Sequence, residues 1–355
     1  MAKTTITPTD REALALVARF PGADTAAVAQ VLVANPSRFD NDGIERSIHP
    51  THSVVARRMA RLAQMGAVHA WRSPAVNITH YGILEGGMDA LNVFGEAPMY
   101  KAHKGGIINK SATALMHGRD IAHVAAQFVH GEYADPAVTN LIGDEVPLTA
   151  FITDAQMHSA VSKYRKNNPT VSLYKHLSTT FAQTPVEELF TPEFWVMNPE
   201  LMVFTAPAGV QTSTTSHRPD LVVLADTNRR VAVEVERSIK PLSTYVDTIR
   251  LFNSTLNGYQ VKGTNKVVRP VHHLVWLCAD NGIKNAIKKA VNAVNPDLIT
   301  KGLVIIADLT KADGTPLTYG ETVPAPGRRR TRPQKVTDPG AMKPKAPTSS
   351  GILQP

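Results

Sequence analysis

The segment HRPDLVVLADTNRRVAVEVE, residues 217–236, restricts the possible folds more than any other part of this chain. Its two apolar runs, 221–224 and 231–236, are rich in β-branched residues and are typical of buried strands. The polar residues 226–230 between them are typical of a turn. The segment therefore predicts a β-hairpin.

Three carboxylates lie at the open end of this predicted hairpin. Glu234 and Glu236 are two residues apart, so they share one face of their strand. A turn loop at 227–229 places Asp220 opposite Glu236, whereas a loop at 226–228 places it opposite Glu234. In both registers, the three carboxylates crowd one face and repel each other. A basic partner or a bound divalent cation relieves this repulsion, and oxygen ligands suit Mg²⁺ or Mn²⁺.

Helical and strand patterns alternate after the hairpin. An amphipathic helix is predicted over about 242–256, a strand over 271–279, a lysine-rich helix over 283–294 and a last strand over 303–308. The order of strand, strand, helix, strand, helix, strand is typical of an α/β sandwich. We therefore expect an α/β domain in the C-terminal half of the chain.

These residues resemble the core of the PD-(D/E)xK nucleases, in which Asp and Glu bind a metal and a Lys two residues later helps to orient the attacking water. The chain is also similar to the replication-relaxation proteins of actinobacterial plasmids and phages, which pair a winged helix with an RPD…EVE pattern and a downstream Lys and Tyr. The resemblance implies a restriction-endonuclease-like domain over 181–320. The matching residues are Arg218-Pro219-Asp220, Glu234-Val235-Glu236, Lys240 and Tyr245.

The resemblance also implies roles for the matching side chains. Asp220 and Glu234 would hold the metal, Glu236 would be a third ligand or a base, and Lys240 would neutralise the scissile phosphate. One departure is that Glu236 stands where the nuclease Lys is expected, and Lys240 comes four residues later. A further acid is expected from an upstream helix, with three candidates: Glu187, Glu188 and Glu193.

The acidic cluster leaves two functions open. One is metal-assisted phosphodiester hydrolysis, which would nick DNA. The other is a non-enzymatic phage or plasmid transcriptional regulator whose nuclease-like domain serves only as a scaffold. A purely structural interpretation is that an arginine pairs with the glutamates, for which the candidates are Arg218, Arg229 and Arg230.

Three helical patterns and a second hairpin pattern occupy residues 1–95. The helices are predicted over about 10–20, 25–32 and 51–64, and the strands over 67–72 and 76–81. This order is typical of a winged helix-turn-helix, whose third helix enters the major groove of duplex DNA. The alternatives are a protein-interaction module and a solvated arginine face. We expect base contacts from Thr51, His52, Ser53, Arg57 and Arg58, and phosphate contacts from Arg61, His69 and Arg72.

A helical connecting region is predicted over residues 96–180. Its main helix runs from Ser111 to Phe128. His117, His123 and His130 are spaced by six and seven residues, whereas a helical metal site uses histidines four apart. We therefore interpret these histidines as structural.

The end of the chain predicts a disordered basic tail over residues 321–355. From residue 322 onward there are seven Lys and Arg against one Asp, so most of the net charge of +8 lies here. The segment is rich in proline and poor in large apolar residues, so it cannot form a packed core. Beside a DNA-binding domain, Arg328, Arg329 and Arg330 would contact phosphates without sequence preference.

Composition limits the class of protein. A single cysteine, Cys278, excludes a disulfide framework and a four-cysteine zinc site. The sequence shows neither an apolar run near the roughly 18 residues of a membrane span nor an apolar N-terminal signal region. We therefore expect a cytoplasmic protein outside membranes. The resemblance to the replication-relaxation proteins implies a phage or plasmid protein that binds double-stranded DNA in replication or relaxation. A second copy of the chain or a replication protein is the further expected partner.

Overall fold

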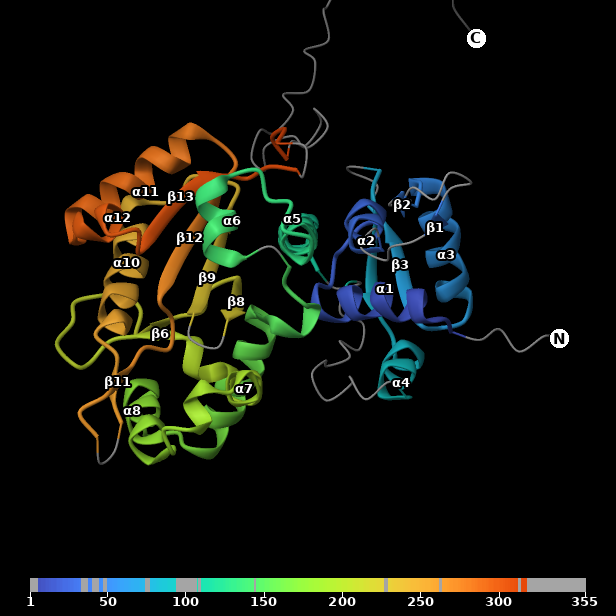
Figure 1. Ribbon diagram of the computed structural model, residues 1–355. Coiled ribbons are helices and arrows are strands. Elements are labelled where there is room, and N and C mark those ends of the chain that lie inside the picture. Colours follow the sequence, from blue (N-terminus) through green and yellow to red (C-terminus); the bar gives the residue numbers. More distant parts are fainter. Residues whose placement is uncertain are drawn as a thin grey trace, which may run out of the picture.

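The computed structural model describes residues 6–32, 38–39, 45–46, 50–73, 77–93, 107, 110–143, 145–226, 229–261, 264–311 and 314–317. The predicted basic tail, with Arg328, Arg329 and Arg330, lies outside the described residues. The fold is a mixed α/β structure with a mixed sheet at its centre, as the sequence predicts at this level (Figure 1). No helix in the described ranges is both long enough and apolar enough to cross a membrane.

The central sheet has five strands in the order β13-β12-β9-β8-β5. β9, β12 and β13 are parallel, whereas β8 and β5 run antiparallel to their neighbours. The six elements predicted after residue 217 are present in the predicted order, and three shorter elements that were not predicted lie between them. The elements are β5 (Phe151–Thr153), β8 (Leu221–Asp226), β9 (Arg229–Glu236), α10 (Leu242–Leu256), β12 (His273–Cys278), α11 (Asn281–Val294) and β13 (Val304–Asp308).

The hairpin of β8 and β9 adopts the second of the two predicted registers. Leu221 pairs with Val233, and the ladder shifts only beside the turn, between Leu224 and Asp226. Continuing the same register places Asp220 opposite Glu234. Asp220 Oδ2 also accepts a hydrogen bond of 2.8 Å from the backbone N–H of Val235, which ties the start of β8 to the end of β9.

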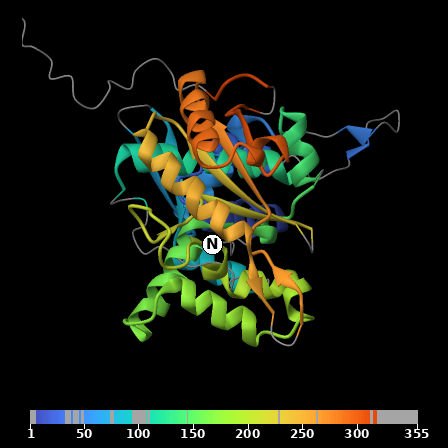
Figure 2. The same ribbon diagram turned by 90° about the vertical axis from the view of Figure 1, so that its left-hand side faces the viewer.

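The two faces of β9 belong to different cores. Val231, Val233 and Val235 lie in one apolar core, whereas Ala232 lies in the other with residues of α10 and α11. Because side chains alternate along a strand, Glu234 and Glu236 share the face of Ala232. Figures 1 and 2 show α10 and α11 covering this second face, on the side away from the N-terminal helices.

The N-terminal part contains the three predicted helices and the predicted antiparallel hairpin in that order, and it adds a short strand pair before the third helix and a fourth helix after the hairpin. Thr7 caps the first helix reciprocally, since its side chain accepts from Asp10 N and Asp10 accepts from Thr7 N. The second strand begins after Asn77, whose φ of 53° interrupts the extended backbone, and so it starts later than predicted. The elements are α1 (Pro8–Arg19), α2 (Thr25–Leu32), β1 (Arg38–Phe39), β2 (Glu45–Arg46), α3 (His52–Gln64), β3 (Val68–Arg72), β4 (Thr79–Ile83) and α4 (Glu85–Val93).

The helix α5 (Ala112–Val129) joins the N-terminal part to the sheet, as Figure 1 shows. It contacts both α2 and β9. Phe20, at the end of α1, also packs edge-on against Phe151 of β5, with ring centroids 5.9 Å apart. As a result, apolar residues of α1, α2, α3, α5 and one face of the sheet form a single core.

Residues 96–180 are not the separate connecting region that the sequence predicts. β5 supplies the fifth strand of the sheet, and α7 (Asp154–Asn167) and α8 (Leu173–Gln183) bury residues in the second core. A strand of three residues is too short to show an alternating pattern, so the sequence does not reveal it. The remaining short elements are α6 (Pro136–Ile142), α9 (Pro192–Met197), β6 (Phe204–Thr205), β7 (Ser216–His217), β10 (Tyr259–Gln260), β11 (Val267–Val268) and α12 (Asp297–Thr300).

Candidate active site and candidate nucleic-acid interface

Asp220 and Glu234 form the centre of a polar cluster where β8 begins and β9 ends. Glu234 is buried, and Asp220 is partly buried. Each carboxylate has a histidine partner: His117 Nε2 lies 2.9 Å from Asp220 Oδ1, and His217 Nε2 lies 2.6 Å from Glu234 Oε1. The cluster therefore joins α5, β7, β8 and β9.

The carboxylates and imidazoles of this cluster shift each other's pKa. Burial opposes ionisation of Asp220, but the charge and hydrogen bond of His117 outweigh it and lower the pKa of Asp220. Burial raises the pKa of Glu234; His217 opposes this effect, and the nearby Asp220 adds to it. Burial also disfavours protonation of both imidazoles, yet the facing carboxylates raise the pKa of His117 and His217. His117, His217 and Glu234 therefore keep their protons to a higher pH than these groups usually do.

Lys240 faces this cluster from the loop between β9 and α10. Its Nζ lies 2.6 Å from Glu236 Oε2. Burial opposes the charge of Lys240, but Glu236, and at longer range Glu234 and Asp220, raise its pKa. The hydroxyl of Tyr245 accepts a hydrogen bond of 3.0 Å from Lys240 N, which fixes the loop. Lys240 therefore approaches the cluster although it lies four residues after the expected position.

The three predicted carboxylate ligands do not converge on one point. Glu236 is held by Lys240, and nowhere in the described ranges are three or more His, Cys, Asp or Glu side chains placed to hold a metal ion together. Mg²⁺ is commonly held by only one or two carboxylates, while waters and substrate phosphates complete its coordination. Asp220 and Glu234 are the two residues that could hold Mg²⁺ or Mn²⁺ in that way, whereas Glu236 is engaged by Lys240 and does not fit as a third ligand.

The arginines considered as partners of the glutamates have other contacts. Arg218 Nε lies 2.6 Å from Asp154 Oδ1. Arg230 stacks over the ring of Trp195 and donates to the carbonyl oxygens of residues 269 and 270. Arg229 donates to the carbonyl oxygen of residue 140. The basic partners of the two glutamates in the structure are therefore His217, which contacts Glu234, and Lys240, which contacts Glu236.

The upstream group that reaches Asp220 is His117 of α5. The candidate acids Glu187, Glu188 and Glu193 are exposed, and no contact in the described part of the chain connects them to the cluster. Spacing alone assigned His117 to a structural role, and its hydrogen bond to Asp220 spans 103 residues, so no local signal reveals it.

Asp120, one turn after His117 on α5, also faces the end of β9. Its Oδ2 lies 3.0 Å from Arg237 Nε. Burial raises the pKa of Asp120 to about 7, although Arg237 and Arg119 oppose the shift. A second weakly acidic carboxyl group therefore lies beside the cluster, and no local sequence pattern indicates it.

The predicted DNA-binding residues of α3 fall into two groups. Thr51, His52, Ser53 and Arg57 are exposed. Arg58 and Arg61 instead form ion pairs with the buried carboxylate of Asp10, so they hold α3 against α1. Arg72 is exposed on the hairpin, where its Nε donates to Asn77 Oδ1 at 2.8 Å, and His69 is partly buried.

Comparison with protein-family models, with curated proteins and with solved structures finds no match to this chain.

Proposed function

We propose that this chain binds duplex DNA through an N-terminal winged helix and nicks DNA at the Asp220 and Glu234 cluster, in replication or relaxation of a phage or plasmid. The observation that carries the proposal is the register of β8 and β9, which continues to place Asp220 opposite Glu234, together with the approach of Lys240, whose Nζ lies 2.6 Å from Glu236 Oε2. Two carboxylates and a lysine at the ends of neighbouring strands are the groups that metal-assisted phosphodiester hydrolysis requires.

Each residue of the cluster has a role in this proposal. Asp220 and Glu234 hold Mg²⁺ or Mn²⁺, which when bound supplies a Lewis acid and lowers the pKa of a coordinated water. Lys240 places positive charge near the scissile phosphate. His117 and His217 are positioning residues, because their hydrogen bonds fix the orientation of the two carboxylates.

The arrangement of α3 supports DNA binding. Thr51, His52 and Ser53 are exposed at the N-terminal end of α3. In helix-turn-helix proteins, this end of the recognition helix contacts bases in the major groove. Arg57 is exposed one turn later. The antiparallel strands β3 and β4 follow α3 in the position of a wing.

Relaxation of supercoiled plasmid tests the proposed activity. We expect the wild-type chain to produce nicked circles with Mg²⁺ or Mn²⁺ and none with excess chelator. Asp220→Asn and Glu234→Gln should reduce nicking to background, and His217→Gln should reduce it about 10- to 100-fold. Glu187→Gln, at an exposed acid outside the cluster, is the matched control and should leave nicking unchanged. Equal nicking by Glu234→Gln and wild type would exclude this site.

A second candidate function is a non-enzymatic regulator that keeps the cluster only as a scaffold. The observation that favours it is that Glu234 and Glu236 already have basic partners within the chain, His217 and Lys240. Footprinting in chelator distinguishes the two functions. A defined protected site together with intact plasmid in every metal would favour the regulator, whereas metal-dependent strand breaks would exclude it.

A further inference from the structure

The helices α7 and α8 present a basic surface that neither the cluster nor α3 uses. Residues 155–186 contain four Lys and Arg and no Asp or Glu. Both views place the two helices together at one end of the molecule (Figures 1 and 2). The four basic side chains are exposed, and within the described ranges none forms an ion pair: Lys163, Arg165, Lys166 and Lys175.

An aromatic pair lies between the two helices. The rings of Tyr164 and His176 stack with centroids 3.9 Å apart. They line a hollow of about 420 Å³ that is also lined by Lys163, four amide side chains and Glu200, whose Oε1 is 3.7 Å from His176 Nε2. Flat rings bind the faces of nucleobases, and amides bind their polar edges. The hollow therefore combines groups that bind a base with a neighbouring positive charge.

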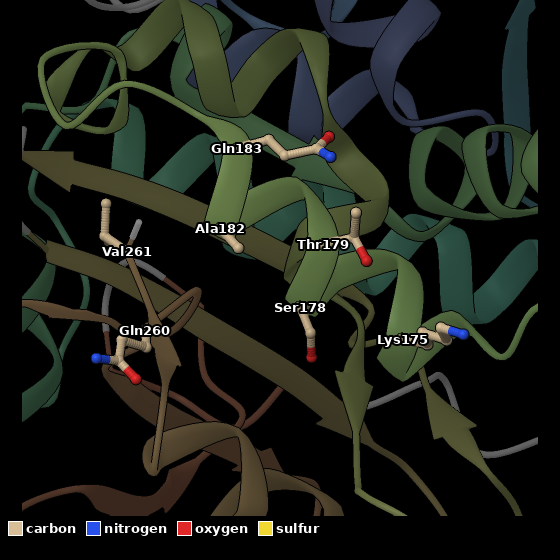
Figure 3. Close-up of a pocket in the computed structure, with 7 residues that line it drawn as sticks. All are labelled: Lys175, Ser178, Thr179, Ala182, Gln183, Gln260 and Val261. Atoms are coloured by element: carbon tan, nitrogen blue, oxygen red, sulfur yellow. The ribbon is translucent and has the colours of Figure 1, made fainter. Parts of the chain in front are cut away.

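The other side of α8 adds a second hollow, of about 590 Å³, which Figure 3 shows. Its lining includes an ammonium group, two hydroxyl groups and two amide groups, all of which donate hydrogen bonds to phosphate oxygens. The opposite side of α8 is apolar and buried, so the polar face is the one left exposed. The lining residues are Lys175, Ser178, Thr179, Ala182, Gln183, Gln260 and Val261.

The helix α7 connects this surface to the cluster. Asp154, its first residue, donates its backbone N–H to the carbonyl oxygen of Asp220 at 3.1 Å. The helix has 14 residues, so its basic end lies about 20 Å from Asp220. A polynucleotide strand held at that end therefore has a short path along α7 to the carboxylates.

We propose that the α7–α8 surface binds single-stranded nucleic acid, with its Lys and Arg side chains on the phosphates and the Tyr164–His176 pair as a platform for a base. Charge complementarity assigns the occupant, since the four exposed basic side chains of α7 and α8 outnumber the one acidic side chain that lines the hollow, Glu200. An aromatic platform reaches the face of a base only when the base is unpaired, which selects a single strand over a duplex. This binding is separate from α3 and does not depend on cleavage at Asp220.

Fluorescence anisotropy with labelled oligothymidylate tests the charged part of the surface. The variant Lys163→Ala/Arg165→Ala/Lys166→Ala should weaken binding at least about 10-fold at low salt. It should also reduce the slope of log affinity against log salt by about 2, because each phosphate contact on a single strand contributes about 0.7. Lys288→Ala/Lys289→Ala, at exposed lysines of α11, is the matched control and should change neither quantity. Equal losses in both variants, or no binding by the wild type, would overturn the proposal.

Two further comparisons test the base platform and the preference for a single strand. Tyr164→Ala should weaken oligothymidylate binding at least about fivefold, whereas Tyr164→Phe should retain it. His176→Gln is a second variant for use where Tyr164→Ala lowers the melting temperature. A duplex of equal length should lose less affinity than oligothymidylate in every variant. Equal losses for duplex and single strand, or equal binding by the Ala and Phe variants, would overturn the single-strand assignment.

Discussion

Asp24 is a buried carboxylate at which α2, β4 and α5 meet. Its Oδ1 accepts a hydrogen bond from Ala27 N at the start of α2 and lies 3.0 Å from His123 Nε2, and its Oδ2 forms an ion pair with Arg119 of α5. Burial alone would raise the pKa of Asp24, but His123 and Arg119 outweigh it and hold that pKa well below the usual range. The ionised carboxylate therefore stabilises the folded chain.

The substitution Asp24→Asn should expose this contribution. At pH 7 we expect the free energy of unfolding to fall by about 3 kcal/mol, because Arg119 and His123 would remain buried without their carboxylate. The pKa of Asp24 is lower in the folded than in the unfolded chain, so its contribution is complete above about pH 4 and is lost as the pH falls further.

Urea unfolding at pH 7 and at pH 3 measures both effects. The difference between wild type and Asp24→Asn should shrink at pH 3. Asp297→Asn, which removes an exposed ion pair with Lys301, should cause little change at either pH. If Asp24→Asn lowered the free energy of unfolding by the same amount at both pH values, ionised Asp24 would not stabilise the fold.

The adjacent arginines of α3 should respond differently to substitution. Arg57 is exposed, whereas Arg58 Nη1 lies 2.8 Å from Asp10 Oδ1. If α3 binds duplex DNA, Arg57→Ala should weaken binding about 5- to 10-fold and leave the melting temperature unchanged. Arg58→Ala should lower the free energy of unfolding by about 1 kcal/mol, because a buried carboxylate loses one of its partners. Anisotropy with a duplex and thermal melting give the two quantities, and identical behaviour of both variants would contradict this division.

At the residue scale, strand alternation predicts only part of the cluster. The shared face of Glu234 and Glu236 follows from their spacing, and the short turn predicts that Asp220 lies beside them. The register that places Asp220 opposite Glu234 was left open, because the bulge beside the turn is not encoded in a simple pattern. His117 and Asp120 reach the cluster through tertiary packing of α5, and no local signal predicts such packing.

The helix α5 passes very close to the turn between α1 and α2. A Cβ atom added at Gly118 would lie 2.6 Å from the carbonyl oxygen of Pro21, well inside contact distance. Gly118→Ala should therefore push α5 away from this turn and lower the free energy of unfolding by about 2 kcal/mol. Urea unfolding measures the change, and Thr113→Ala, at an exposed position of the same helix, should have little effect. Equal stability of Gly118→Ala and wild type would be incompatible with this close approach.

At the element scale, the length of a helix or strand decides whether its pattern can be recognised in the sequence. The helices and longer strands after residue 217 have clear apolar periods bounded by turn residues, and their order is predicted correctly. The strands β5, β10 and β11 have two or three residues and carry no periodic signal. Because β5 was not recognised, residues 96–180 were interpreted as a connecting region, although they complete the sheet.

At the scale of the whole molecule, the sequence divides the chain more sharply than the structure does. Changes of pattern along the chain predicted separate units over 1–95 and 181–320. In the structure, α5 and the contact of Phe20 with Phe151 connect these parts into one apolar core. Burying charged groups such as Asp24 at this junction is tolerable only while both sides remain packed. The N-terminal helices and the sheet should therefore unfold together.

The three tryptophans of the chain allow this expectation to be tested. Trp71 lies in β3 of the N-terminal part, whereas Trp195 and Trp276 are buried in the second core, on the far side of the sheet. In the Trp71→Phe variant, fluorescence reports only on the two tryptophans of the second core. The difference in fluorescence between the wild type and this variant reports on Trp71. If the shared core couples the two parts, both signals should change at the same urea concentration, and far-ultraviolet circular dichroism should coincide with them. A Trp71 transition at clearly lower urea would mean that the N-terminal part unfolds on its own, and α5 would then be a linker between two independent domains.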